Sequence, residues 1–325
     1  MRIAIAGAGI SGAYMYRLLK GYGHDVTIFD KEKITKCGIS PCAWGTTKGF
    51  EDLVKRAGLN PEDYIFRRFD HVWFDEIRIK AYMLTFDKPK LIMDLLGDAE
   101  VKDTDPSISR IDQSKFDRVI DATGVARAYL PRITNDLISP CYQYRMVRDQ
   151  PAEMRIKISK IGYAWSFPLY EKEFHVGAGS LVMDPIKILR DLSWVDPLKN
   201  EGVKCACYSN VRLTVPRGSR PFVQDNVWGI GEAIGCVAPI LAEGIIPGMK
   251  SALILLENFY SPVDYERAIL REFAWMDKER EVVERLQSGK PIGLGSALVL
   301  QRNTRRMEMK MGLWDAFKLL RRARK

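Results

Sequence analysis

The sequence predicts an α/β fold: a Rossmann-like nucleotide-binding domain, interrupted by an inserted antiparallel β-sheet domain and followed by a helical C-terminal segment. Three observations predict it. Residues 1–30 have the pattern strand, glycine-rich turn, helix, strand; residues 64–86 and 141–182 are rich in aromatic and β-branched residues; and the chain after residue 260 is charged and helical. At 325 residues, with 46% apolar and 28% charged residues, the chain is globular in composition, with a length typical of about two domains.

The nucleotide-binding domain is expected to be assembled from separate stretches of chain. Arg2–Ala6 has the apolar run of a buried strand, and Asp25–Asp30 follows as a second strand after a helix. Further on, Lys88–Leu96 is expected to be a short helix, Phe116–Asp121 a strand, and Gly244–Tyr260 an apolar helix. The predicted division is residues 1–63, 86–126 and 209–260 for the nucleotide-binding domain, 64–85 and 127–208 for the sheet domain, and 261–325 for the helical segment.

Three glycines in the first turn, Gly7, Gly9 and Gly12, have the spacing of a dinucleotide-binding turn. The first permits the tight turn, the second lets the backbone approach a pyrophosphate, and the third allows helix and strand to pack closely. The helix that follows offers free N–H groups and a partial positive charge to the phosphates. Asp30 ends the second strand, where it can accept hydrogen bonds from a ribose. An acid there repels a 2′-phosphate, so the expected ligand is FAD or NAD and not NADP.

A second glycine-rich segment, Gly231–Ile245, favours FAD over NAD. It follows a short apolar strand and leads into a helix at Gly244. The segment resembles one in flavoproteins of the glutathione reductase type, in which an acid holds the ribityl chain and the next helix faces the N1/O2 edge of the flavin. The resemblance assigns the acid to Glu232, where Asp is usual. A helix N-terminus suits that edge because reduced flavin carries negative charge there.

Further segments resemble the geranylgeranyl reductase family of flavoproteins. Gly162–Pro168 matches the family's Tyr-x-Trp-x-Phe-Pro segment, Phe174–Gly179 matches the strand after it, and Cys42–Gly45 resembles the family's Cys-x-x-Gly loop near the flavin. The spacing within Gly231–Ile245 also matches, and the resemblance runs from residue 1 to about residue 260. Together these motifs are specific, although each alone is modest.

The chain departs from that family at three places. Trp44 stands where the family has Glu, Lys88 corresponds to an Arg that reaches FAD, and the stretch Asp121–Gly124 replaces the usual Ala-Asp-Gly. The middle region and the C-terminus are also shorter than in typical members, so the lipid cavity is expected to be smaller or more open.

The resemblance implies an FAD-dependent oxidoreductase that reduces C=C bonds of a geranylgeranyl-type isoprenoid chain, with hydride supplied by flavin N5. Cys42, Tyr163 and Trp165 are the candidates around the reacting alkene; Cys42 either donates a proton or packs beside the ring. Tyr163, Trp165 and Phe167 alternate and so share a strand face, as a wall for the prenyl chain or as ordinary sheet core. The predicted cofactor-binding residues are Gly7, Gly9, Gly12, Asp30, Cys42, Ala43, Gly45, Lys88, Gly231, Glu232, Pro239, Gly244 and Ile245.

Other residues and other activities compete with this interpretation. Cys37 is a weaker catalytic candidate than Cys42, and His175 is expected to be a satisfied core residue on a strand. An FAD-dependent monooxygenase or halogenase acting on an aromatic or quinone substrate is the alternative enzyme, and a flavin-binding redox protein without turnover is the second alternative. No second glycine-rich turn has strand and helix flanks, so the electron donor is expected to be transient: NADPH or a ferredoxin-like protein.

The C-terminal 25 residues carry most of the net charge. Residues 301–325 hold nine Lys or Arg and two acids, hence +7 of the chain's +9. Leu313, Phe317 and Leu320 share a helical face with Trp314 on its flank, whereas Lys318 and Arg322 are expected to point away from it. The segment is interpreted as a peripheral contact with an anionic membrane, the alternative being a helix docked on the catalytic body.

Composition and spacing also limit the compartment and the partners. The N-terminus lacks a secretory pattern and no apolar run is long enough to cross a membrane, so we expect a cytoplasmic protein, at most peripheral to the inner face of the cell membrane. Six cysteines in 325 residues imply no disulfide framework, and their spacing with three histidines makes no metal site. Nothing in the basic tail indicates nucleic-acid binding.

Overall fold

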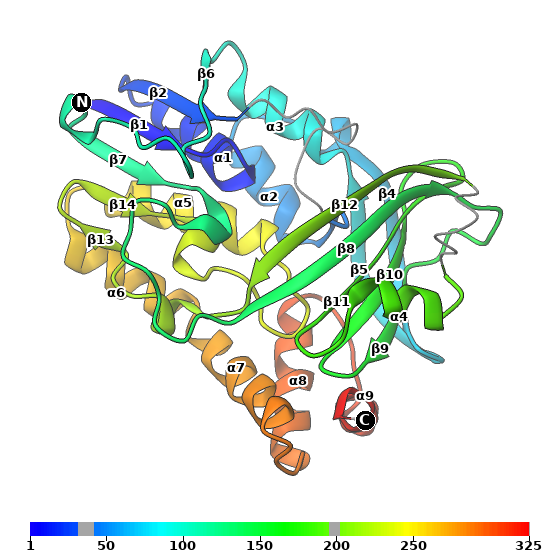
Figure 1. Ribbon diagram of the computed structural model, residues 1–325. Helices are drawn as coiled ribbons and strands as arrows, with labels where there is room; N and C mark the ends of the chain where they lie inside the picture. Colours follow the sequence, from blue (N-terminus) through cyan, green and yellow to red (C-terminus); the bar gives the residue numbers. More distant parts are fainter. Residues whose placement is uncertain (32–41, 195–201, 325) are drawn as a thin grey trace.

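The computed structural model describes residues 1–31, 42–194 and 202–324, which form two β-sheets and a set of helices (Figure 1). The first sheet has six strands in the order β13-β14-β7-β1-β2-β6, all parallel except the β13–β14 pair. Its strands are β1 (Arg2–Ala6), β2 (Asp25–Asp30), β6 (Val101–Asp103), β7 (Arg118–Asp121), β13 (Val223–Gln224) and β14 (Val227–Gly229). A parallel sheet of this kind confirms the predicted Rossmann-like domain.

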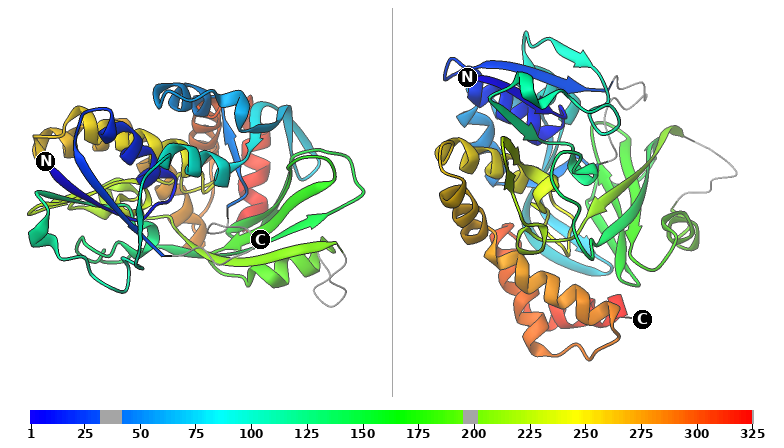
Figure 2. Two further views of the ribbon diagram at one scale, coloured as in Figure 1. Left: turned by 90° about the horizontal axis from the view of Figure 1, so that it is seen from above. Right: turned by 60° about the vertical axis from the view of Figure 1, so that its left-hand side comes forward.

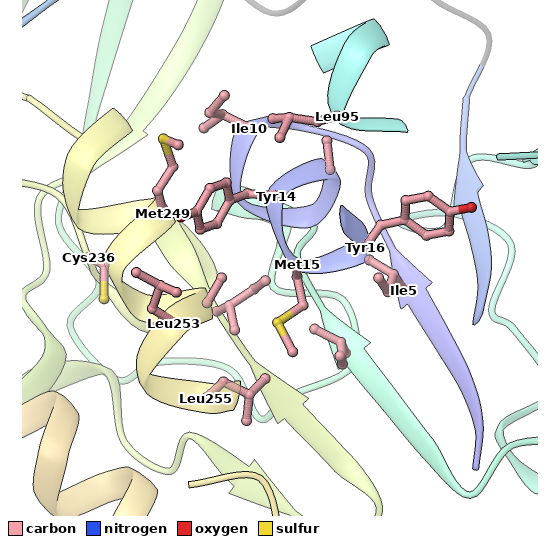
Figure 3. Packing of buried hydrophobic residues seen from close by; sticks show 14 of the residues in the cluster. Ile5, Ile10, Tyr14, Met15, Tyr16, Leu95, Cys236, Met249, Leu253 and Leu255 are labelled. Atoms are coloured by element: carbon pink, nitrogen blue, oxygen red, sulfur yellow. The ribbon is translucent and has the colours of Figure 1, made fainter. Parts of the chain in front are cut away.

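Helices pack on this parallel sheet through apolar faces. Tyr14 of α1 lies beside Met249 and Leu253 of α5, while Ile10 of α1 lies beside Leu95 of α3 (Figure 3). These contacts remove the apolar faces of the helices from water, which is the main stabilising term of such a layer. The helices near this sheet are α1 (Ile10–Lys20), α2 (Gly49–Arg56), α3 (Lys88–Leu96), α5 (Ile245–Glu257) and α6 (Pro262–Glu272).

The second sheet has eight strands in the order β12-β8-β11-β10-β9-β4-β5-β3, all antiparallel neighbours except the β9–β4 pair. Its strands are β3 (Gly45–Thr47), β4 (Ile65–Phe74), β5 (Ile77–Phe86), β8 (Ile138–Val147), β9 (Arg155–Ser159), β10 (Gly162–Pro168), β11 (Glu173–Ser180) and β12 (Val203–Arg212). One face packs on α4 (Pro185–Asp191), and the other faces the nucleotide-binding domain and the C-terminal helices (Figure 2). This is the predicted inserted sheet.

The C-terminal segment forms α7 (Ala274–Gln287), α8 (Leu294–Arg306) and α9 (Leu313–Arg324), which lie against the second sheet (Figure 1). The apolar face of α9 is turned inward: Ala316, Leu319 and Leu320 are buried in the core formed with β4, β5 and β9. The carbonyl of Ala323 accepts a hydrogen bond from the backbone N–H of Ile161, which ties the end of α9 to the sheet. Of the described helices, none has the length and apolar character needed to cross a membrane.

The structure corrects three expectations for side chains. Leu320 belongs to the apolar face that was interpreted as a membrane contact, but it is 3% exposed, so this part of the face docks on the catalytic body, as in the alternative interpretation. Arg322 does not point away; it pairs with Asp75 at 2.6 Å and with Glu76 in the β4–β5 turn. Cys205 is disulfide-bonded, a pairing that the sparse cysteines did not indicate.

Candidate active site

A continuous cavity of about 860 Å³ is lined by both sheets and by the C-terminal helices. One end, called the nucleotide end, is lined by Gly7, Gly9, Asp30, Lys88, Gly124, Glu232 and Gly244. The other, called the apolar end, is lined by Phe74, Met83, Ile156, Ile158, Ile161, Leu181, Val283, Leu286, Leu300, Met307, Met309, Met311, Leu319, Leu320 and Ala323. Tyr163, Trp165 and Cys42 line the same cavity.

The turn between β1 and α1 has the close backbone contacts of a phosphate-binding turn. Gly7 has φ +101°, and a Cβ there would lie 2.5 Å from the Ala122 carbonyl oxygen; a Cβ on Gly12 would overlap the Gly7 carbonyl. Gly9 differs, because a Cβ there would meet nothing within 4 Å and its backbone borders the cavity. Gly9 is also the N-cap of α1 and brings no side chain to the helix end. The open backbone beside a free helix N-terminus fits a pyrophosphate.

Asp30 lies at the carboxyl end of β2 and lines the nucleotide end. Its carboxylate accepts hydrogen bonds from the backbone N–H groups of Ala8, at 3.1 Å, and Lys31, at 3.0 Å. The bond to Ala8 links the acid to the glycine turn, so the groups expected to bind ribose and pyrophosphate are held together.

Glu232 follows β14 in a short 3-10 turn and faces the cavity opposite Gly124. One carboxylate oxygen accepts a hydrogen bond from the Arg212 backbone N–H at 2.7 Å, and the other would lie 3.3 Å from a Cβ on Gly124. Burial raises the pKa of Glu232, while the Arg212 N–H and the charges of Arg212 and Lys88 act in the opposite direction. Lys88, the first residue of α3, also lines the cavity, so it can place a positive charge beside a bound cofactor.

Arg212 organises this region and was not predicted from the sequence. Its guanidinium group is buried, pairs with Asp136 at 3.0 Å, and donates hydrogen bonds to the carbonyls of Gly124, Val125 and Glu232. It therefore clamps the turn after β7 to the turn after β14. A buried arginine with all these partners is a strong positioning element.

Two glycines of β11 leave room for side chains that line the cavity. In the register of β10 and β11, Trp165 lies opposite Gly177 and Tyr163 lies opposite Gly179. A Cβ on Gly177 would overlap the Trp165 ring, and one on Gly179 would lie 2.7 Å from the Cys141 sulfur. The missing side chains make room for both groups.

A chain of hydrogen bonds connects Trp165 of β10 to the Cys42 loop. The indole N–H of Trp165 donates to the Gln143 side-chain oxygen at 3.1 Å, and the Gln143 amide donates to the Cys42 carbonyl at 3.2 Å. Cys42 is a free cysteine. The sheet thus fixes the backbone that presents its thiol to the cavity. Gly45 ends this loop, and a Cβ there would come within 2.7 Å of the Phe167 ring.

The loop from Pro239 to Gly244 is held from several directions. The Tyr163 hydroxyl donates to the Leu241 carbonyl at 2.5 Å, and burial raises the pKa of Tyr163 well above its usual range. From α7, the buried carboxyl of Glu279 accepts the N–H of Ile240 at 3.3 Å. Its anchors come from the sheet domain and from the C-terminal helical segment.

The described residues among the predicted site residues gather around the cavity. All of them line it except Gly12 and Gly231, which instead permit close packing: a Cβ on Gly231 would overlap the Ser11 hydroxyl. Cys37 lies outside the described residues.

Two further side chains show how the Cys42 loop differs from the family pattern. Trp44 has φ 56° and is buried, with its ring 4.5 Å from that of His175. His175 is a core residue as expected; burial lowers its pKa to about 3, while a contact with the backbone of Ala43 acts in the opposite direction. Neither side chain lines the cavity.

Comparison of sequences finds a distant relative. No family model matches the chain. An uncharacterized protein of Methanocaldococcus jannaschii, MJ1182, is 26% identical over 342 aligned residues, which cover 87% of this chain and 91% of the relative.

Solved structures match the whole architecture. A geranylgeranyl bacteriochlorophyll reductase-like protein from Thermoplasma acidophilum is similar with a TM-score of 0.67 at 17% identity, over 100% of this chain and 91% of the other. A tryptophan 6-halogenase from Streptomyces toxytricini has a TM-score of 0.67 at 14% identity, over 99% and 90%. A probable FAD-dependent monooxygenase from Pseudomonas aeruginosa has a TM-score of 0.58 at 16% identity, over 98% and 99%. The chain therefore has the fold shared by FAD-dependent oxidoreductases of the geranylgeranyl reductase-like, halogenase and monooxygenase types.

Proposed function

We propose that the protein is an FAD-dependent oxidoreductase that reduces C=C bonds of an isoprenoid chain of the geranylgeranyl type. The observation that carries this proposal is the cavity itself, which runs from the nucleotide end into an apolar end lined by residues of α7, α8 and α9. Among the described residues, the charged side chains that line it belong to the nucleotide end and the loops beside it. The rest of the lining is mostly aliphatic, methionine and aromatic side chains, with some hydroxyl and thiol groups such as those of Thr304 and Cys207. A long hydrocarbon ligand suits such a surface because its burial requires no polar partners.

FAD fits the nucleotide end on this chain's own residues. The open backbone at Gly9 would take the pyrophosphate, Asp30 the adenosine ribose and Glu232 the ribityl chain. Lys88 supplies positive charge on the same side. The similarity to reductases and monooxygenases of the same fold supports this choice of cofactor.

When bound, FAD supplies the hydride equivalent for reduction of the alkene. The chain's own residues orient the alkene and keep water out. Trp165 and Phe167 form an aromatic wall on β10, and the Trp165 indole is fixed by Gln143. Cys42 presents a thiol to the cavity and is our candidate proton donor; the Tyr163 hydroxyl is committed to Leu241 and serves to fix the loop. NADPH or a ferredoxin-like protein would reduce the flavin as a transient donor.

The decisive test is anaerobic incubation of dithionite-reduced, FAD-loaded protein with three probes. These are a geranylgeranyl glycerophospholipid, geranylgeranyl diphosphate and a quinone with a prenyl side chain. Mass spectrometry should find the mass of two added hydrogen atoms per reduced bond in at least one probe. If all three probes return unchanged while the flavin stays reduced, isoprenoid reduction is wrong.

An FAD-dependent monooxygenase or halogenase of an aromatic or quinone substrate is the second candidate, and the structural similarities support it equally. The aromatic wall of Trp165 and Phe167 favours it as well, because such rings stack on an aromatic substrate. Oxygen uptake coupled to NADPH oxidation, and stimulated by an aromatic substrate, would identify a monooxygenase; a reductase should turn over better without oxygen. A flavin-binding protein without turnover would fail both tests.

We also propose that the tail makes a peripheral membrane contact. The fold limits this contact to the residues of α9 that remain exposed. Since α9 buries Leu319 and Leu320, the contact would use Trp314, which is 66% exposed, with the exposed basic residues Lys318 and Arg321 around it. Such a contact would bring the enzyme to a water-insoluble substrate. Interfacial Trp with Lys and Arg is the usual composition of such contacts.

A further inference from the structure

The N-terminus of α5 is occupied by an acid from its own chain. One carboxylate oxygen of Glu243 accepts hydrogen bonds from the backbone N–H groups of Ile245 and Ile246, both at 3.0 Å. The Thr46 hydroxyl of β3 lies 3.4 Å from the same oxygen. Glu243, Gly244, Ile245 and Thr46 all line the cavity. The carboxyl group is therefore placed on the free amides of a 13-residue helix, at the cavity surface.

Those amides belong to the helix N-terminus that the resemblance to flavoproteins of the glutathione reductase type places at the N1/O2 edge of the flavin. The N-terminus of a helix attracts one anion, because its unpaired N–H groups and its dipole both favour negative charge. The electron-rich edge of a flavin and the Glu243 carboxylate thus compete for the same donors. A neutral carboxyl group competes less and does not repel the flavin.

Resting on the proposed FAD site, we propose that Glu243 is a built-in competitor at the flavin edge, so that FAD binding is coupled to uptake of a proton by Glu243. Protonation of the carboxyl group, or its departure from the Ile245 and Ile246 amides, opens the site. Deprotonation closes it. The protein then binds FAD more tightly on the acidic side of neutrality.

The surroundings of Glu243 place this coupling in the physiological range. Burial raises the pKa of Glu243 to about 7, while the two N–H bonds, the Thr46 hydroxyl and the charge of Lys250 act to lower it. Lys250 lies on α5 and is paired with Glu272 at 2.6 Å, which reduces its effect. From β3 the group that faces the carboxyl is the neutral Thr46. If FAD binding favours the neutral acid, the affinity is full below pH 7 and falls as the pH rises through the pKa.

The test is fluorescence titration of the full-length apoprotein with FAD between pH 6 and pH 9. The wild-type dissociation constant should rise by up to about tenfold for each pH unit above 7, as expected for one linked proton. Glu243→Gln keeps an oxygen that can cap the helix but carries no charge, and its dissociation constant should match the wild-type value at pH 6 and stay flat. Glu243→Ala should also be flat, which protects the test against a folding defect peculiar to one variant.

Glu279→Gln is the matched control, because Glu279 is a second buried acid whose pKa is raised to about 7 and which holds the same loop from α7. It should keep the wild-type slope. The proposed competition by Glu243 is wrong if the wild-type affinity for FAD does not change with pH, or if the pH dependence persists in Glu243→Gln. FAD binding itself would be unaffected by either result. Absence of FAD binding at every pH overturns the proposed cofactor site as well.

Discussion

The two ends of the cavity are built in different ways. At the nucleotide end, the surface is largely backbone: glycines at 7, 9 and 124, a helix N-terminus, and a few charged side chains held by backbone N–H groups, as Asp30 is by Ala8. At the apolar end, the lining residues are aliphatic, methionine and aromatic. They come from β4, β5 and β9, from three helices near the end of the chain, and from connecting segments that hold Ile161, Leu181, Met309 and Met311. The first end offers donors at fixed positions that suit phosphates and hydroxyls, and the second offers apolar side chains.

The difference teaches where each end is sensitive. A surface made of backbone is sensitive to substitutions that add side-chain atoms, because its glycines lie at close contacts that leave no room for a Cβ. A side-chain surface is damaged by removing atoms, since each loss leaves a cavity that the surroundings fill only in part. Substitutions chosen at each end should therefore separate cofactor binding from the enclosure of the substrate.

The largest effect is expected at the glycine turn. Gly12→Val forces a Cβ onto the Gly7 carbonyl, so the turn must open; we expect a loss of more than about 3 kcal/mol of unfolding free energy and no bound FAD. A Cβ at position 9 meets no atom within 4 Å, so the Gly9→Val apoprotein should unfold at the wild-type temperature and still fail to bind FAD. Flavin absorbance per protein and thermal unfolding measure both. Full flavin occupancy in Gly9→Val would show that the pyrophosphate lies elsewhere.

At the apolar end, Leu320→Ala should cost about 2–4 kcal/mol of unfolding free energy, because the residue is buried between α9 and the second sheet. FAD occupancy should be unchanged. Trp314→Ala on the same helix is the control: its ring is exposed, so stability should move by less than about 0.5 kcal/mol. Denaturant unfolding of the two variants makes the comparison. Loss of FAD from Leu320→Ala would mean that the two ends are not separable.

Between the two ends, Cys42→Ala should keep the flavin and lower isoprenoid reduction by about 10²-fold or more if the thiol donates the proton. Cys207→Ala is the matched control, since Cys207 is also a free cysteine that lines the cavity but lies on β12. It should retain most of the wild-type rate. The measurement is the rate of isoprenoid reduction by dithionite-reduced protein under anaerobic conditions. Equal rates for both variants would show that Cys42 is a packing residue.

The smallest effect concerns the exposed surface of α9, whose buried residues line the apolar end. Lys318→Ala should weaken binding to anionic vesicles by about 1 kcal/mol, roughly fivefold, at low salt. Lys115→Ala, an exposed lysine of the nucleotide-binding domain, should have no effect. Vesicle co-sedimentation of full-length protein is preferable to truncation, because removal of α9 would also remove Leu319 and Leu320 from the cavity wall. If wild type does not sediment with anionic vesicles at low salt, the membrane contact is wrong.

The predicted elements and the nucleotide end depend on neighbours close in sequence. The turn between β1 and α1, the acid at the end of β2 and the helix after Gly244 are each set within a few residues by glycine spacing and apolar periodicity. For this reason the fold class could be predicted from the sequence, and the structure confirms it. The exact domain limits and the roles of individual site residues stay predictions until variants are measured.

The residues that the sequence did not reveal act over long separations. Arg212 clamps turns that begin at Gly124 and Glu232, and Gln143 joins Trp165 to Cys42. A polar side chain that is to be buried in a sheet looks like any other polar residue in a strand. One usable signal was present: small residues at alternate positions of β11, Gly177 and Gly179, beside an aromatic strand.

The sequence by itself determined what needs only local chemistry: the dinucleotide turn, the alternation of strands and helices, and the aromatic face of β10. The tertiary structure decided what depends on the partner of each surface. The apolar face of α9 has the same pattern whether it meets a membrane or a sheet, and only packing against β9 assigns Leu319 and Leu320 to the cavity wall. Likewise, Glu243 is an ordinary acid in the sequence, and only the fold brings it beside Thr46 of β3 at the cavity surface. The hydrophobic effect is non-directional. The apolar pattern of a helix therefore indicates how much surface must be buried, but only the tertiary structure determines which partner buries it.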